Sequence, residues 1–193
     1  MKVNQEIFYH ANSGNELSIG DELIFDLNTH NKMYDEVYNN EYKLNKMDAN
    51  EILINKKRDK EYTLTEEEFN LIFRTINNNA FVMREVALEE VRKNKYPDYP
   101  SRLNCLYVTK EKEDAVEWSN ILKRNKKQCN QVLKLECTGE LFIGDGELMK
   151  RQNISYQKHL ENAEKYWNGV NITTPEYLFY GTAKVIDIDN IEL

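Results

Sequence analysis

Residues 105–119 have the sequence "CLYVTKEKEDAVEWS", in which a strand pattern passes directly into a helix pattern. The apolar run "LNCLYVT" at 103–109 predicts a strand, and the segment after it predicts a helix from about 111 to 124. Thr109 stands where a helix cap is expected. A strand and a helix joined within one short segment indicate a domain that mixes both kinds of element.

Three further regions have the residue content of strands. The first is "EIFYHANS" near the amino terminus, which Ser13-Gly14 interrupts. The runs "QVLKLEC" and "ELFIG" are expected as a hairpin that turns at Thr138-Gly139. In the last, "EYLFYGTAKVIDI", Gly181 predicts a bulge or a close approach of another backbone.

Helical periodicity is clearest in the middle of the chain and towards its end. Thr65 followed by Glu68 fits a capping box, and "EEEFNLIFRTI" then places four apolar residues on one face. The asparagines at 77–79 are expected to end this helix before a second one, "AFVMREVALEEVRKN". A further helix, "YQKHLENAEKYW", is predicted to open at Ser155 and to stop at Gly169.

The chain of 193 residues, 40% hydrophobic and 31% charged, is predicted to form a globular domain. We expect one α+β domain over residues 1–193, with a mainly helical insertion at about 28–98. Residues 28–62 are polar, and either loosely packed short helices or an extended loop is expected there.

Composition also indicates the cellular compartment and the kinds of partner to expect. No run reaches the roughly 18 apolar residues of a membrane span, and "MKVNQEIFYHANSG" lacks the apolar core of a signal peptide. Three cysteines without a close pair predict neither a disulfide framework nor a cysteine zinc site, so we expect a cytoplasmic protein without a membrane partner. The net charge of −7 disfavours broad affinity for nucleic acids but allows a local basic groove.

Four features could carry chemistry, and each also has a plain structural explanation. Tyr107 and Trp118 are either core residues or two rings that face each other across a flat ligand. Glu176 is either a solvated charge at a strand start or a carboxylate that the sheet holds in a cleft. His10 is either packed or reactive, and the small Ala11 after it leaves backbone groups accessible.

Taken in order along the chain, these features resemble the ADP-ribosyltransferase superfamily. The similarity is to its His-Tyr-Glu branch, that of diphtheria toxin and the poly(ADP-ribose) polymerases, and it covers about a third of the chain. The matching residues are His10-Ala11, then Tyr107 and Trp118 eleven residues apart, then Glu176 in "PEYLFYG". This chain has Ala11-Asn12 where the superfamily usually has glycine and threonine, and Trp118 where it usually has tyrosine. The wider pattern also resembles a bacterial domain family without an assigned activity.

The resemblance implies a split antiparallel or mixed β-sheet core with flanking helices, and NAD as the substrate. It implies that Tyr107 and Trp118 hold the nicotinamide ring and that backbone groups of Ala11 hold its carboxamide. It implies that His10 binds a ribose hydroxyl, and that Glu176 stabilises the positive charge that develops as the glycosidic bond breaks.

Two arginines are candidates for binding the pyrophosphate, because a guanidinium matches phosphate oxygens. Arg102 is the first and Arg84 the second, although by itself each is better explained as a surface or helix-face charge. The loop "KYPDYPSR" is expected beside this site. No metal is expected, since His30 and His159 lack partners at metal-ligand spacing.

The function that follows from the resemblance is transfer of ADP-ribose from NAD to a protein, a DNA or an RNA. An NAD glycohydrolase and a catalytically silent module that binds a nucleotide, a nucleic acid or a protein are the alternatives. An RNA 2′-phosphotransferase is less favoured, because its basic cluster is not evident. Thr174 stands two residues before Glu176, where arginine-modifying transferases have a second glutamate, so arginine is disfavoured as the acceptor.

Overall fold

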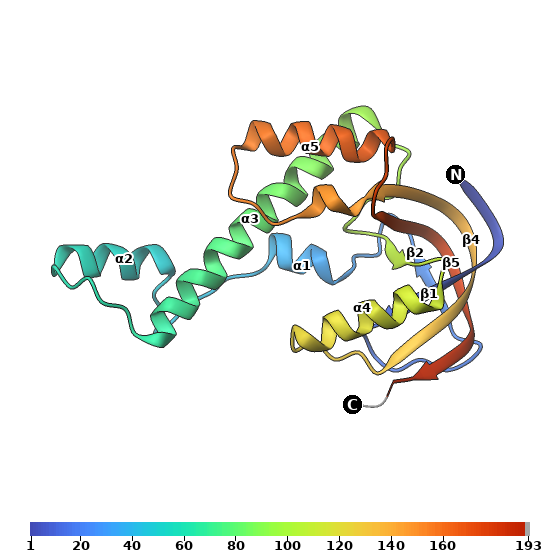
Figure 1. Ribbon diagram of the computed structural model, residues 1–193, viewed down its shortest axis with the longest axis horizontal. Coiled ribbons are helices and arrows are strands. Elements are labelled where there is room, and N and C mark those ends of the chain that lie inside the picture. Colours follow the sequence, from blue (N-terminus) through green and yellow to red (C-terminus); the bar gives the residue numbers. More distant parts are fainter. Residues whose placement is uncertain (192–193) are drawn as a thin grey trace.

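The computed structural model describes residues 1–191, and this part of the chain is an α+β fold of one five-stranded sheet and five α-helices (Figure 1). The strands are β1 (Lys2–Asn12), β2 (Glu22–Phe25), β3 (Leu106–Val108), β4 (Gln131–Asp145) and β5 (Pro175–Asn190). The helices are α1 (Lys32–Tyr38), α2 (Ala49–Arg58), α3 (Glu66–Lys95), α4 (Lys112–Arg124) and α5 (Tyr156–Asn168), with a short 3-10 helix, η1 (Gly146–Met149). None of the helices within residues 1–191 is both long enough and apolar enough to cross a bilayer.

The sheet is antiparallel and strongly curled. Strand β4 lies between β1 and β5, while β3 and β2 follow one another along the other edge of β5. Thr109, just after β3, exchanges two backbone hydrogen bonds of 2.8 and 2.9 Å with Tyr9 of β1. The curl therefore brings β3 back to β1, so that the sheet has a concave inner face and a convex outer face.

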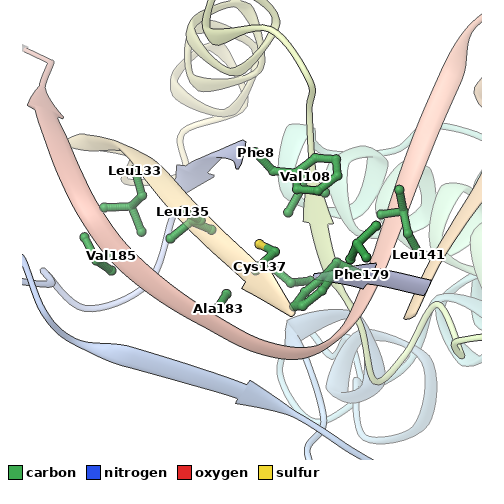
Figure 2. Close-up of a cluster of buried hydrophobic side chains, with 11 residues drawn as sticks. Phe8, Val108, Leu133, Leu135, Cys137, Leu141, Phe179, Ala183 and Val185 are labelled. Atoms are coloured by element: carbon green, nitrogen blue, oxygen red, sulfur yellow. The ribbon is translucent and has the colours of Figure 1, made fainter. Parts of the chain in front are cut away.

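The inner face of the curled sheet holds the main core. Side chains from four strands meet there, as Figure 2 shows for a cluster that includes Phe8, Val108, Leu133, Leu135 and Phe179. Because side chains alternate along a strand, the residues between these ones point to the outer face. That face is covered by α3 and α5, whose Leu88 and Trp167 pack with Tyr107, Phe142 and Leu178.

The segment expected to turn at Thr138-Gly139 is instead one continuous strand, β4, of 15 residues. The predicted hairpin is therefore wrong. Gly139 lies opposite Gly181 of β5, and a Cβ atom on Gly139 would stand 2.2 Å from the Tyr180 carbonyl oxygen. Two glycines let the backbones of β4 and β5 approach at the bend, which confirms the close approach predicted at Gly181.

The two helices expected on either side of 77–79 are also one element, the 30-residue α3. Asn77 remains helical, and its side-chain amide donates to the Phe73 carbonyl at 2.8 Å. Buried residues on both sides of the asparagines, Leu71 against α2 and Phe81 against the body, hold the helix straight through them. Tertiary packing thus overrides the weak helix propensity of asparagine.

The predicted helix ends are confirmed in three places and wrong in one. Thr65 and Glu68 form the reciprocal bonds of a capping box, Ser155 caps α5, and Gly169 ends it in the left-handed conformation at φ 65°. Helix α4 is preceded by Glu111, which makes no side-chain cap, so Thr109 does not cap it. The Thr109 hydroxyl instead donates to the Glu111 carbonyl at 2.9 Å.

Residues 28–98 contain α1, α2 and α3, and their outer part projects as an arm away from the sheet (Figure 1). In the arm, α2 packs its Ile52 against Leu71 of α3. The opposite side of α3 presents Phe69, Phe73 and Ile76 to solvent, each more than half exposed. The arm is therefore held by a thin apolar contact, whereas the carboxyl-terminal half of α3 belongs to the main body.

Candidate functional site

Glu176 and Tyr107 lie on neighbouring strands and on the same face of the sheet. Strand β3 pairs with β5 so that Tyr107 stands opposite Leu178. Residues directly opposite each other in an antiparallel pair share a face, and so do residues two apart along one strand. Tyr107, Leu178 and Glu176 therefore all project to the outer face, beneath α3 and α5.

The carboxylate of Glu176 is bound through one oxygen and free at the other. Its Oε2 accepts hydrogen bonds from the Tyr166 hydroxyl at 2.6 Å and from Nη1 of Arg102. Its Oε1 has no hydrogen-bond partner within residues 1–191. In that part of the chain, Nε2 of His159 is the one buried side-chain polar atom without a partner. Oε1 of Glu176 is therefore not buried. With 18% of its side chain exposed, Glu176 is thus oriented by the protein and open to a ligand at Oε1.

Behind Glu176 lies a chain of buried charges. The Arg102 guanidinium donates from Nε to Glu85 Oε2 at 2.8 Å, and Arg84 donates to Glu85 Oε1 at 2.6 and 2.9 Å. Two carboxylates and two guanidinium groups alternate, so each charge that the fold removes from water has an opposite partner.

The balance of burial and pairing sets the charge states in this chain. Burial opposes the charged form of Arg102, but the carboxylates of Glu176 and Glu85 outweigh it and raise the pKa of the guanidinium. Burial likewise opposes the charge of Glu85, and Arg102 and Arg84 outweigh it and lower the pKa of that carboxyl. The groups behind Glu176 therefore stay ionised at neutral pH.

Two phenol rings flank Arg102 in this site. The guanidinium carbon of Arg102 lies 5.5 Å from the centre of the Tyr107 ring and 5.1 Å from that of the Tyr166 ring. Burial is the largest influence on both phenols and raises the pKa of each, so both remain neutral hydrogen-bond donors. The Tyr107 hydroxyl donates a hydrogen bond to the Arg102 carbonyl at 3.2 Å. This bond fixes the ring and leaves no free hydroxyl proton.

His10 reaches Tyr107 through the backbone. Its Nδ1 lies 2.8 Å from the Tyr107 carbonyl oxygen, which can only accept, so Nδ1 carries the proton in the neutral ring. Burial lowers the pKa of His10, so Nε2 keeps a lone pair at neutral pH. His10 stands opposite Leu133 of β4 and therefore projects to the inner face, away from the face that carries Tyr107 and Glu176.

Trp118 does not meet Tyr107 in the described part of the chain. It lies on α4, which packs against β1 and β4 through the buried Ala115 and Ser119, and its side chain is 51% exposed. The Tyr107 ring instead packs with the cluster under α3 and α5. Ala11, opposite Val132, is buried next to His10.

Both arginines expected at a pyrophosphate are in internal pairs. Arg84 and Arg102 are buried, and Arg84 also donates to the Met149 carbonyl. Their guanidinium groups therefore hold Glu85 and Glu176 in place. Across residues 1–191, no three His, Cys, Asp or Glu side chains gather as a metal site requires, and the three cysteines are buried free thiols.

Two members of the site were not singled out from the sequence, Glu85 and Tyr166. In "REVALEEV" Glu85 has the spacing of an ordinary helix-face charge, and Tyr166 has that of a core aromatic on α5. The available signal was the adjacent Arg84-Glu85 pair on the apolar side of α3. Its partners, at 102 and 176, are distant in sequence and could be found only from the fold.

Comparison with known proteins places the chain in a family. The model of the family described as "Protein of unknown function (DUF2441)" matches residues 8–192. Since this match covers nearly the whole chain, the protein belongs to that family. A search of curated proteins found no match. The family description names no activity.

Proposed function

We propose that this protein cleaves the nicotinamide glycosidic bond of NAD and transfers ADP-ribose to a macromolecular acceptor. In this reaction the bond between ribose C1′ and the nicotinamide nitrogen breaks, and its electron pair leaves with the nicotinamide. A nucleophile of the acceptor then bonds to C1′ and gives up its proton. The chain's part is to stabilise the positive charge that builds on the ribose and to receive that proton.

The observation that carries the proposal is the half-engaged carboxylate of Glu176. Oε2 is fixed by Tyr166 and Arg102, and Oε1 is accessible without a partner. A carboxylate held in this way can accept a hydrogen bond from a ribose 2′-hydroxyl without first reorganising, which is the arrangement that makes electrostatic stabilisation effective. It can also take the proton of the incoming nucleophile.

Tyr107 and His10 support the same site in different ways. Tyr107 shares the outer face with Glu176 and would supply a ring surface for the nicotinamide. We assign His10 the positioning of the Tyr107 strand through the Tyr107 carbonyl, since its ring lies on the inner face and not on the face of Glu176. Trp118, half exposed on α4, would have to approach Tyr107 on binding to complete a clamp.

A catalytically silent binding module is the second candidate, and one observation favours it. Arg102 neutralises Glu176, and neither Arg102 nor Arg84 is presented to solvent. A buried, charge-balanced network of this kind also serves simply to join α3, β5 and α5. In such a module Glu176 would contribute to stability and not to turnover. An NAD glycohydrolase differs from the transferase only in using water as the nucleophile.

The proposal is tested by incubating purified protein with NAD labelled in the adenosine portion and following nicotinamide release. With a cell lysate added, label that becomes sensitive to protease or nuclease identifies the class of acceptor. Label that stays in small molecules while nicotinamide is released would identify the glycohydrolase. No release of nicotinamide by the wild-type protein, with or without lysate, would contradict both activities.

A further inference from the structure

A groove on the outer side of the body has five aromatic side chains in its lining, and the proposed chemistry does not use it. It has a volume of about 340 Å³ and lies between α1, the last turns of α3 and the loop that follows α3. Small-molecule sites commonly begin at about 300 Å³. We call it the Tyr34 groove, and its ring-bearing lining residues are His30, Tyr34, Tyr38, Tyr99 and Tyr180.

The first wall is a ladder of rings along α1. The rings of His30 and Tyr34 are parallel to within 4° with centres 3.6 Å apart, and the Tyr38 ring follows at 4.8 Å. Spacing of four residues puts all three on one side of the helix and its entry. Tyr38 is 51% exposed, so its ring is accessible from solvent.

The second wall is the loop "YPDYP" at 96–100, and it is rigid. The Tyr99 ring packs against Phe142 at 4.9 Å and Tyr96 at 5.3 Å. Arg92 donates to the carbonyls of Pro97 and Tyr99 at 3.1 and 3.0 Å, and Glu89 holds Arg92 in turn at 2.7 Å. Across residues 1–191 no ring contact joins the two walls, so the groove between them is preformed.

The free polar groups on the two aromatic walls of the groove are tyrosine hydroxyls. The hydroxyls of Tyr34, Tyr38 and Tyr99 have no hydrogen-bond partner within the described residues. Arg92, the one guanidinium lining the groove, is already bound by a carboxylate and two carbonyls. Glu89 and Asp98 further oppose an anion there, and the other lining cation, Lys93, has its ammonium group 3.7 Å from Glu89 Oε1. The lining therefore suits a flat ring with polar edges and not a phosphate group.

We propose that the Tyr34 groove binds a planar nitrogen heterocycle, the base of a nucleoside or nucleotide. The base lies between the α1 ladder and Tyr99, and the tyrosine hydroxyls meet its ring nitrogens and exocyclic groups. Stacking on aromatic faces tolerates different bases, because every base has a flat π surface. The hydroxyls then favour one base over another.

The position of the groove relates it to the site around Glu176. Tyr180 is four residues after Glu176 on β5 and projects to the same face, roughly 13 Å farther along the strand. Ser101 and Leu103, on either side of Arg102, also line the groove. A base held there would lie within the span of a dinucleotide from Oε1 of Glu176. It could belong either to the NAD that the proposed function requires or to the acceptor.

The test measures binding and not turnover, so it is independent of the proposed reaction. Adenosine, guanosine, cytidine and thymidine are titrated into the purified protein by calorimetry, with ribose 5-phosphate as the probe that lacks a base. At least one nucleoside is expected to bind at least tenfold more tightly than ribose 5-phosphate. No difference between any nucleoside and ribose 5-phosphate would overturn the proposal.

Two variants place the binding in the groove. Tyr99→Leu removes one wall, and Tyr38→Ser removes an exposed ring of the other with little risk to folding; each is expected to weaken nucleoside binding at least tenfold. Tyr62→Leu, which removes an exposed ring on the arm, is the matched control and is expected to bind like wild type. Equal affinity of Tyr38→Ser and wild type would overturn the proposal.

Competition distinguishes the two sources of the base. If ADP-ribose displaces the bound nucleoside, the groove holds a base of the NAD molecule. If ADP-ribose and the nucleoside bind together, the groove holds a base of the acceptor. Either outcome supports a heterocycle site, and both can be obtained even if nicotinamide release proves absent.

Discussion

The Tyr166 hydroxyl donates a 2.6 Å hydrogen bond to Oε2 of Glu176, joining the end of α5 to the start of β5. This bond fixes one oxygen of the carboxylate, and a hydrogen bond to a charged acceptor is stronger than one between neutral groups. Tyr166 is therefore a positioning residue for Glu176, and its ring stays packed whether or not the hydroxyl is present.

Tyr166→Phe is expected to lower nicotinamide release about tenfold, since a hydrogen bond to a charged group contributes about 1.5 kcal/mol or more. The loss is expected in kcat and not in the affinity for NAD, because the bond orients Glu176 and does not touch the substrate. Tyr156→Phe removes a similar 2.7 Å bond to Glu90 on the surface and serves as the control. An unchanged kcat in Tyr166→Phe would show that the bond does not act on Glu176.

Glu85 holds two buried guanidinium groups, so Glu85→Gln is expected to be strongly destabilising. Arg84 and Arg102 would remain buried with one carboxylate fewer, and breaking a buried ion pair typically costs about 3–5 kcal/mol. Chemical denaturation gives this loss directly. Glu41→Gln removes an exposed partner of Lys43 and is expected to leave the midpoint unchanged. Similar midpoints for the two variants would contradict the role of Glu85.

The stability of the protein is expected to depend on pH through His10. Burial lowers the pKa of His10 in the folded protein, so the unfolded chain binds the proton more readily, with a pKa of about 6.5. The contribution of neutral His10 is therefore complete above about pH 6.5 and is lost as the pH falls through the lower folded value.

His10→Gln keeps a donor for the Tyr107 carbonyl and cannot be protonated. Its free energy of unfolding is expected to fall less steeply than that of wild type between about pH 7 and pH 5. His30→Gln, at an exposed position, is expected to retain the wild-type slope. If His10→Gln and His30→Gln have the same slope, His10 is not buried in its neutral form.

Two neighbouring residues of α3 are expected to differ sharply in their effect on stability. Leu71 is buried against Ile52 of α2, and Leu71→Ala is expected to cost about 2–4 kcal/mol. Phe73 is 58% exposed, and Phe73→Ser is expected to change stability by less than about 0.5 kcal/mol. Thermal unfolding of the two variants measures both values. A large loss of stability in Phe73→Ser would mean that another surface covers this side of α3 in solution.

Local signals predicted the helix ends well, because caps are made by residues a few positions apart. Thr65 and Glu68 form the expected box, and Gly169 takes the backbone angle that glycine favours. The predicted hairpin at Thr138-Gly139 was wrong because glycine is favoured both in a tight turn and where two strands approach closely. Only the partner, Gly181 on the neighbouring strand, decides between them.

The site was less accessible to sequence reasoning than the fold. The positions of Tyr107 and Glu176 follow from recognising two strands, and the fold does put them on one face. The pairing of Arg102 with Glu176 and Glu85 joins segments 74 and 17 residues apart, and no local pattern reports it. The loop "KYPDYPSR" was expected beside the candidate pyrophosphate site; its Arg102 bonds Glu176, and its Tyr99 lines the Tyr34 groove.

The account depends most on Glu176 acting through its free oxygen. The most direct measurement is nicotinamide release from NAD by wild type and by Glu176→Gln, together with the affinity of each for NAD. Glutamine can keep the hydrogen bonds to Arg102 and Tyr166 but has no negative charge. We expect similar affinity and a loss of turnover of at least a hundredfold. Equal turnover in the two proteins, or no turnover in wild type that binds NAD, would contradict the account.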